Sequence, residues 1–161
     1  MISGLHYGTR KPVSIRTQGA QIEAVRPGQG KCFVGPGLVD LQVNGFVGLD
    51  FNTPPVPADL PGRVTRELWK VGVTSYLATI ITNSAESIEA CARAIGRACG
   101  QDPACAAGIA GIHLEGPFIS PEDGPRGAHA KQFVTAPDWD AFRRWQDASG
   151  GRVRLITLSP E

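Results

Sequence analysis

Residues 111–120 read GIHLEGPFIS, an alternation of side chains that ends abruptly at a Gly-Pro pair. In an extended strand successive side chains point to opposite faces, so His113 and Glu115 share one face while Ile112 and Leu114 share the other. The Gly-Pro pair ends the strand and leaves Glu115 at its carboxyl end. In parallel α/β proteins, ligands and catalytic groups gather at this end of the strands. The stretch therefore predicts a carboxylate that is presented to a functional loop.

Strand and helix patterns alternate around this stretch. The expected strands cover residues 38–45, 73–79, 110–115 and 153–158. Apolar residues at three- and four-residue steps predict helices over 59–70, 84–99 and 138–148. This alternation implies an α/β chain with a parallel sheet and right-handed crossovers. Four such strands are half of a (β/α)8 barrel, and 161 residues are too few for a whole one, which needs roughly 200 or more.

Residues 1–35 have a different character. Short apolar pieces at 13–15, 22–25 and 32–34 are separated by glycine-containing turns. Strand and turn signals at such close spacing are typical of a small antiparallel sheet.

Two of the predicted elements have distinct faces. In the strand at 38–45, alternation predicts a polar face of Asp40, Gln42 and Asn44 opposite an apolar face of Val39, Leu41 and Val43. In the helix at 138–148, aromatic residues recur at steps of three, and we expect all of them to pack against the sheet: Trp139, Phe142 and Trp145.

The residues alone leave the chemistry of the strand end open. Glu115 is suited to ligating a metal, to acting as a general base or to pairing with a cation. His113 is suited equally to a hydrogen-bonded core position and to a ligand role. The irregular, turn-rich loop at 120–129 is long enough to indicate a functional role.

Composition excludes several classes of protein. Hydrophobic residues make up 42% and charged residues 19%, which is typical of a globular protein. A net charge of +1 without a basic run gives no footprint for nucleic acid or an anionic membrane. The cysteines at 32, 91, 99 and 105 form no Cys-x-x-Cys pair, and no signal peptide or apolar span is visible. We therefore expect reduced thiols in a cytoplasmic protein.

Three motifs resemble those of the N-acetylglucosamine-6-phosphate deacetylase family of the amidohydrolase superfamily. They are PGLVDLQVNG at 36–45, GVT at 72–74 and HLEGPFIS at 113–120 followed by GAH at 127–129, and the ending ITLSPE at 156–161 is similar too. The resemblance implies a metal-dependent (β/α)8 barrel beside a small β-sandwich. Residues 1–35 then form a partial sandwich segment and residues 36–161 the first half of the barrel, with about four strands.

The resemblance also implies roles for individual residues. Glu115 matches the glutamate that binds one catalytic divalent metal ion, commonly zinc or iron. Ala128, through its backbone, and His129, near the reacting amide, match the loop that contacts the amino sugar. Gln42 and Asn44 occupy positions where many amidohydrolases have metal-binding histidines, and we expect them near the substrate in a one-metal site, because a neutral amide is a poor ligand for such an ion.

The implied reaction is hydrolysis of N-acetylglucosamine 6-phosphate to glucosamine 6-phosphate and acetate. In the family, two further metal-binding histidines and the general acid/base aspartate come later in the chain than Glu161. We therefore expect no complete catalytic set here, either because the product is truncated or because a longer protein continues. The alternatives are a deacetylase of N-acetylgalactosamine 6-phosphate and a catalytically silent half-barrel that serves as an interaction module.

A half barrel also has an open edge. Its last strand would be unpaired and an apolar face would meet water. We therefore expect the chain to form a homo-oligomer such as a dimer, or to pair with a complementary fragment.

Overall fold

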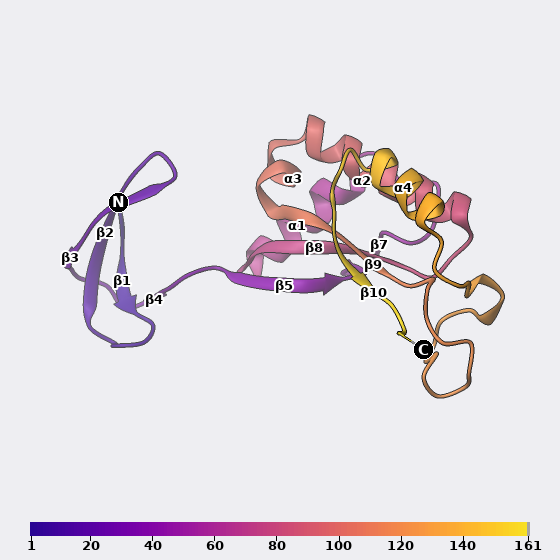
Figure 1. The fold of residues 1–161 in the computed structure, drawn as a ribbon. Coiled ribbons are helices and arrows are strands. Elements are labelled where there is room, and N and C mark those ends of the chain that lie inside the picture. The colour runs from indigo at the N-terminus through magenta and orange to yellow at the C-terminus, as the bar shows by residue number, and fades with distance from the viewer. Residues whose placement is uncertain (161) are drawn as a thin grey trace. The chain divides into compact units, whose positions relative to one another are not determined.

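The computed structural model describes residues 1–160, which divide into two compact units, Met1–Gly37 and a second unit that begins at Leu38. Each unit has its own sheet (Figure 1). The assignment of these units as a sandwich segment and a half barrel stays a prediction.

The first unit is a small, mostly antiparallel sheet. Its strands are β1 (Ile2–His6), β2 (Pro12–Gln18), β3 (Gln21–Pro27) and β4 (Phe33–Val34). They lie in the order β3-β2-β1-β4, and β4 joins the edge of β1 in parallel. Apolar side chains such as Ile22 and Val25 are exposed. This sheet therefore buries little of its own apolar surface.

The second unit alternates strands and helices along the chain. Its main elements are β5 (Leu38–Val43), α1 (Leu60–Lys70), β8 (Val73–Ile81), α2 (Ala85–Gln101), α3 (Pro103–Gly108), β9 (Ile109–Glu115), α4 (Trp139–Ala148) and β10 (Val153–Thr157). Smaller elements are β6 (Gly45–Phe46), β7 (Leu49–Asp50) and the 3-10 turn Lys131–Phe133.

The four main strands form a parallel sheet in the order β10-β9-β8-β5. This confirms the predicted α/β chain with a parallel sheet. In the described residues the sheet is open, with β5 and β10 as its edges, so no closed barrel is present.

The hydrophobic core lies between the helices and one face of this sheet. Side chains that point from β8 and β9 toward the helices include Ala78, Ile80, Ile112 and Leu114. The helices supply the other side of the core, including Val64, Ile88 and Ile95. Figure 1 shows α2, α3 and α4 together on one side of the sheet.

The first strand of this sheet corrects the predicted alternation. Asp40 pairs with Tyr76, and Val43 pairs with Ala78, so three steps along β5 match two along β8. This irregularity is a β-bulge, which exchanges the faces on its two sides. The polar and apolar faces predicted for residues 39–44 are therefore wrong as continuous faces: Val39 is exposed and Val43 is buried.

The aromatic residues of α4 are only partly core residues. Trp145 is buried and its indole N–H donates to the Ala85 carbonyl at 3.1 Å. Trp139 is 69% exposed and stacks on Phe142 with ring centroids 5.4 Å apart. A helix turns about 100° per residue, so Trp139 lies about 120° away from Trp145 around the axis. The expectation that all of the aromatic residues face the core is therefore wrong for Trp139.

A short helix that we did not predict follows α2. α3 begins at Pro103 and is capped by Asp102, whose carboxylate accepts from the Ala104 N–H at 2.8 Å. Arg66 donates two hydrogen bonds to the same carboxylate, at 3.0 and 3.1 Å. These hydrogen bonds, first that of Arg66, lower the pKa of Asp102. The pair Asp102-Pro103 could have predicted the start of this helix, because aspartate is a preferred N-cap residue and proline a preferred first helical residue.

Among residues 1–160, no helix combines the length and apolar character needed to cross a membrane.

The core makes a prediction that can be checked with two valines. Val64 in α1 is fully buried, whereas Val71 at the end of the same helix is 56% exposed. We expect Val64→Ala to lower the free energy of unfolding by about 2 kcal/mol, because it removes two buried methyl groups and leaves a cavity. Val71→Ala is the matched control and should change it by under about 0.5 kcal/mol. Equal losses in urea denaturation would contradict this packing.

Thiol reactivity tests the same packing without mutation. Cys91, Cys99 and Cys105 are buried, and Cys32 is exposed. Burial raises the pKa of Cys91 and of Cys105 to about 11. Because the thiolate is the reactive form, an aromatic disulfide reagent at pH 8 should label Cys32 rapidly in the folded chain. The buried thiols should react only after unfolding, and rapid labelling of them in the native chain would contradict the structure.

Candidate functional site

A cavity of about 290 Å³ lies where β5, β8 and β9 end. Its walls come from the end of β5 and the residue after it, from the end of β8, from the end of β9 and from the loop that follows β9. The lining residues are Gln42, Asn44, Ile81, Glu115, Ala128 and His129. The structure thus brings together the five residues to which the resemblance assigned substrate or metal binding. Ile81 also lines the cavity, and the sequence did not predict it.

The backbone around Glu115 is fixed on both sides. Glu115 is the last residue of β9, and the Thr82 hydroxyl donates to its carbonyl at 3.3 Å. The next residue, Gly116, has φ of 85°, and a Cβ there would lie 2.1 Å from the Thr82 Oγ1 atom. Its N–H donates to the Thr157 carbonyl at 3.2 Å. Only glycine meets both constraints, which is why the strand turns at this point.

His129 faces the same carboxylate from the loop. Its Nε2 atom lies 3.9 Å from Oε1 of Glu115, and both side chains are about four-fifths buried. This distance is too long for a hydrogen bond. The two side chains form an ion pair only when the imidazole is protonated. The Nδ1 atom of His129 is buried without a hydrogen-bond partner among the described residues. A buried polar atom without a partner is uncommon in a folded protein, and it marks this ring as a candidate functional group.

His113 has a structural position. It is buried, and its Nε2 atom lies 2.8 Å from the Thr157 hydroxyl on β10. It is not among the residues that line the cavity. Of the two roles left open for His113, the structure favours the hydrogen-bonded core histidine.

The side chain of Asn52 joins the ends of β5 and β8. Its amide N–H groups donate to the carbonyls of Asn44 at 3.2 Å and Thr79 at 3.1 Å. Its Oδ1 atom accepts from the Ile81 N–H at 2.8 Å. Asn52 therefore fixes two residues that line the cavity without lining it itself. Sequence reasoning missed it, because its partners lie 8, 27 and 29 residues away along the chain.

The residues in the cavity do not complete a metal site. A catalytic metal usually has about three protein ligands and one open position. Within residues 1–160 there is no group of three His, Cys, Asp or Glu side chains placed to hold an ion. Glu115 and His129 supply one carboxylate and one imidazole. The described chain offers part of a ligand set, and no reaction step is assigned to a metal.

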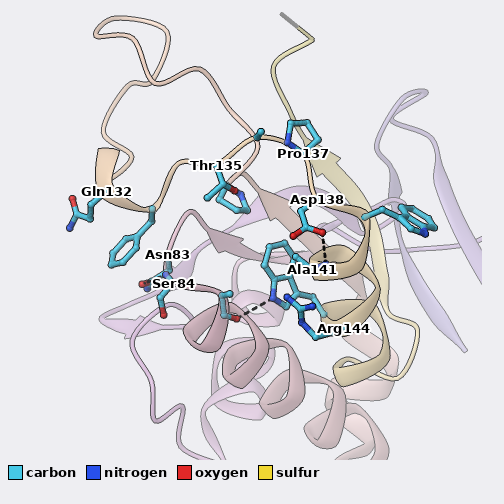
Figure 2. Close-up of a pocket in the computed structure, with 14 residues that line it drawn as sticks. Asn83, Ser84, Gln132, Thr135, Pro137, Asp138, Ala141 and Arg144 are labelled. Atoms are coloured by element: carbon cyan, nitrogen blue, oxygen red, sulfur yellow. Dashed lines mark hydrogen bonds between the residues drawn. The ribbon is translucent and has the colours of Figure 1, made fainter.

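A larger depression of about 700 Å³ lies over the start of α2 and α4 (Figure 2). Its polar groups have structural uses: Ser84 caps α2, and Asp138 caps α4. Figure 2 shows the hydrogen bond between Asp138 and Ala141, and the Trp145 indole N–H donates to the Ala85 carbonyl at the start of α2. None of the predicted site residues lines it. We therefore place the site in the smaller cavity, where a carboxylate, an imidazole and two amides meet.

An α/β sheet that gathers such groups at the carboxyl edge of its parallel strands has the architecture of an α/β enzyme domain. Curated relatives agree. N-acetylglucosamine-6-phosphate deacetylase of Bacillus subtilis is 34% identical over 128 residues, which are 78% of this chain and 31% of that protein. The Bos taurus deacetylase is 37% identical over 136 residues, 82% of this chain and 32% of that protein. No protein-family model matches.

Solved structures extend the similarity to the fold. A mutant N-acetyl-D-glucosamine-6-phosphate deacetylase of Mycobacterium smegmatis, in complex with N-acetyl-D-glucosamine-6-phosphate, matches with a TM-score of 0.77 and 29% identity. The match covers 93% of this chain and 39% of that one. The deacetylase of Pasteurella multocida has the same fold at 22% identity, with a TM-score of 0.76 over 96% of this chain and 43% of that one.

These findings confirm the predicted resemblance: the chain is similar, over most of its length, to N-acetylglucosamine-6-phosphate deacetylases. It spans about a third of the length of the curated relatives it matches, and a fragment from the N-terminal part of such a protein fits the matches.

The role of Asn52 can be measured. Asn52→Ala removes three hydrogen bonds and leaves the partly buried backbone groups of Asn44, Thr79 and Ile81 without that partner. We expect a loss of about 2 to 3 kcal/mol in the free energy of unfolding. Thr53→Ala, at the exposed neighbouring residue, is the control and should lower it by under about 1 kcal/mol. If denaturant titration shows no greater loss for Asn52→Ala than for the control, the clamp is not formed.

Proposed function

We propose that this chain forms the N-terminal part of an N-acetylglucosamine-6-phosphate deacetylase and supplies part of its substrate site. One observation carries the proposal: Gln42, Asn44, Glu115, Ala128 and His129 come from separate segments and line one cavity. The resemblance had assigned these same residues to substrate or metal binding. Similarity to the deacetylases over about four-fifths of the chain supports the substrate class.

The proposed reaction adds water to the acetamide carbonyl and breaks the C–N bond, which yields acetate and glucosamine 6-phosphate. The Gln42 and Asn44 amides would hydrogen-bond the polar groups of the sugar. The Ala128 backbone and the His129 imidazole would hold the acetamide against Glu115. We assign no general acid/base to the described residues, because the resemblance places that aspartate later than Glu161.

Glu115 is proposed as one ligand of a divalent metal ion, zinc or iron by the resemblance. The buried environment supports this role, since a largely buried carboxylate at a strand end is a suitable oxygen ligand. The remaining ligands would come from outside the described residues.

The proposed architecture is the first half of a (β/α)8 barrel with a partial β-sandwich, in a cytoplasmic protein. The two edge strands of the open sheet, β5 and β10, leave apolar surface that another chain could cover. Exposed apolar side chains lie on β5 and on or just after β10: Leu38, Val39, Leu41, Leu155 and Leu158. We propose that a second copy or a complementary fragment covers them.

Two alternatives have their own support. N-acetylgalactosamine-6-phosphate deacetylase of a Shewanella species is 39% identical over 130 residues, which keeps the galacto sugar as a candidate substrate. The incomplete ligand set favours a catalytically silent half-barrel that serves as an interaction or oligomerisation module.

Ligand-observed NMR and an acetate assay test the proposal on the 161-residue chain. We expect saturation transfer to N-acetylglucosamine 6-phosphate, measured with and without zinc and compared with the galacto sugar. Glu115→Gln should weaken binding of zinc by about tenfold, because it removes the carboxylate charge. His129→Asn should weaken binding of the sugar by about tenfold, because it replaces the imidazole with a shorter side chain that no longer reaches the same hydrogen-bond partner. Glu122→Gln, an exposed residue of the same loop, is the matched control.

The outcomes separate the candidates. Binding that the cavity variants weaken supports the deacetylase site, whether or not this chain releases acetate by itself. Absence of binding to either sugar phosphate, or binding that Glu115→Gln and His129→Asn leave unchanged, would contradict it. The silent half-barrel would then remain, and stable self-association would support it.

A further inference from the structure

Arg126 is a largely buried cation in the loop that carries Ala128 and His129. Its side chain is 18% exposed, although the loop runs over the surface and has no regular secondary structure at this point. Its Nη1 atom donates to the His129 carbonyl at 2.6 Å. Its Nη2 atom pairs with Asp123, whose side chain is 87% exposed. Withdrawing a guanidinium from water is costly unless hydrogen bonds and charges compensate for it. The contacts of Arg126 therefore favour the loop conformation in which they form.

The two contacts of Arg126 contribute unequally to the stability of the loop. An ion pair with an exposed carboxylate contributes little, because water screens it. The bond to the His129 carbonyl is short and charge-assisted, and it is part-buried. It also spans the turn that presents Ala128. The contact with His129 is therefore the one that fixes the loop.

Backbone hydrogen bonds alone fix this turn weakly. The Gly127 N–H donates to the Gly124 carbonyl at 3.0 Å, and the His129 N–H donates to the Arg126 carbonyl at a long 3.4 Å. The Arg126 N–H donates to the Glu122 carbonyl at 3.0 Å. All of these bonds, including that of the Arg126 side chain, lie within the loop, so they fix the shape of the turn. Without the guanidinium, the His129 backbone would keep only this long bond within the loop.

We propose that Arg126 is a positioning residue that fixes the conformation of the Ala128–His129 turn by binding the His129 carbonyl, and thereby orients the His129 ring toward Glu115. This inference rests on the proposed function, because the turn matters for function only if the cavity binds substrate. Arg126 itself does not line the cavity. It acts through the placement of the His129 ring, which sets the 3.9 Å separation between the imidazole and the carboxylate.

Four variants of the 161-residue chain test the proposal. Arg126→Met removes the guanidinium donors and keeps an apolar stem, whereas Arg126→Lys keeps a charge and one donor for the His129 carbonyl. Asp123→Asn removes only the ion pair. Arg143→Met, at an exposed position on α4, is the matched control for loss of an arginine. Each variant is examined by thermal melting, by amide hydrogen exchange and by nuclear Overhauser contacts between the His129 ring and the Glu115 side chain.

We expect Arg126→Met to raise exchange at the Gly127 and His129 amides by about tenfold, the size expected for losing one charge-assisted hydrogen bond. The contacts between His129 and Glu115 should disappear while the melting temperature stays near that of the parent. Arg126→Lys should restore part of both signals. Asp123→Asn and Arg143→Met should leave them unchanged.

Other outcomes would overturn the proposal. Contacts between His129 and Glu115 that survive Arg126→Met would show that the turn holds itself. An equal effect of Asp123→Asn would assign the loop order to the ion pair. A collapse of the melting temperature in both Arg126 variants would make the residue a general stabiliser. None of these readouts needs a ligand, so a failure here is distinct from a failure of the sugar phosphate to bind.

Discussion

The parallel pairing of β8 with β9 is the constraint that places the candidate site. The two strands pair from Tyr76 with Ile109 to Ile81 with Glu115, so they end side by side at one edge of the sheet. One face of the pair packs against the helices through Ile80 and Leu114. Slipping the register by one residue would turn this apolar face away from the core. The cost of that exposure keeps Glu115 at the edge.

Polar clamps then convert this edge into a cavity. Asn52 ties the end of β5 to β8, and Thr82 ties the end of β8 to the carbonyl of Glu115. Arg126 holds the loop that closes the remaining side. Each clamp is a side chain bonded to backbone, so the walls are fixed by groups that do not themselves enter the cavity. These contacts shape the cavity although residues 1–160 do not contain a complete set of metal ligands.

Local sequence patterns predicted most helices and strands of the second unit. Alternation up to the Gly-Pro pair predicted the strand that ends at Glu115, and helical spacing predicted α1, α2 and α4 within a few residues. The failures have physical causes. The bulge in β5 arises from pairing with β8, which leaves no mark in the alternation of residues 38–44. Trp139 has the spacing of a core residue, but the helix packs through the face of Ala141 and Trp145.

The candidate site divides in the same way. The strand pattern predicted Glu115, and the family resemblance predicted roles for the residues at 42, 44, 128 and 129, because strand ends and family motifs are local signals. The structure gathers these residues around one cavity, and their roles stay predictions. Nothing in the sequence pointed to Asn52 or Arg126, which look like ordinary loop residues until their partners are known. Only the folded chain brings the Asn52 amide to the ends of two strands and the His129 ring to 3.9 Å from Glu115. Those contacts join residues far apart in the chain, and packing and strand register set them.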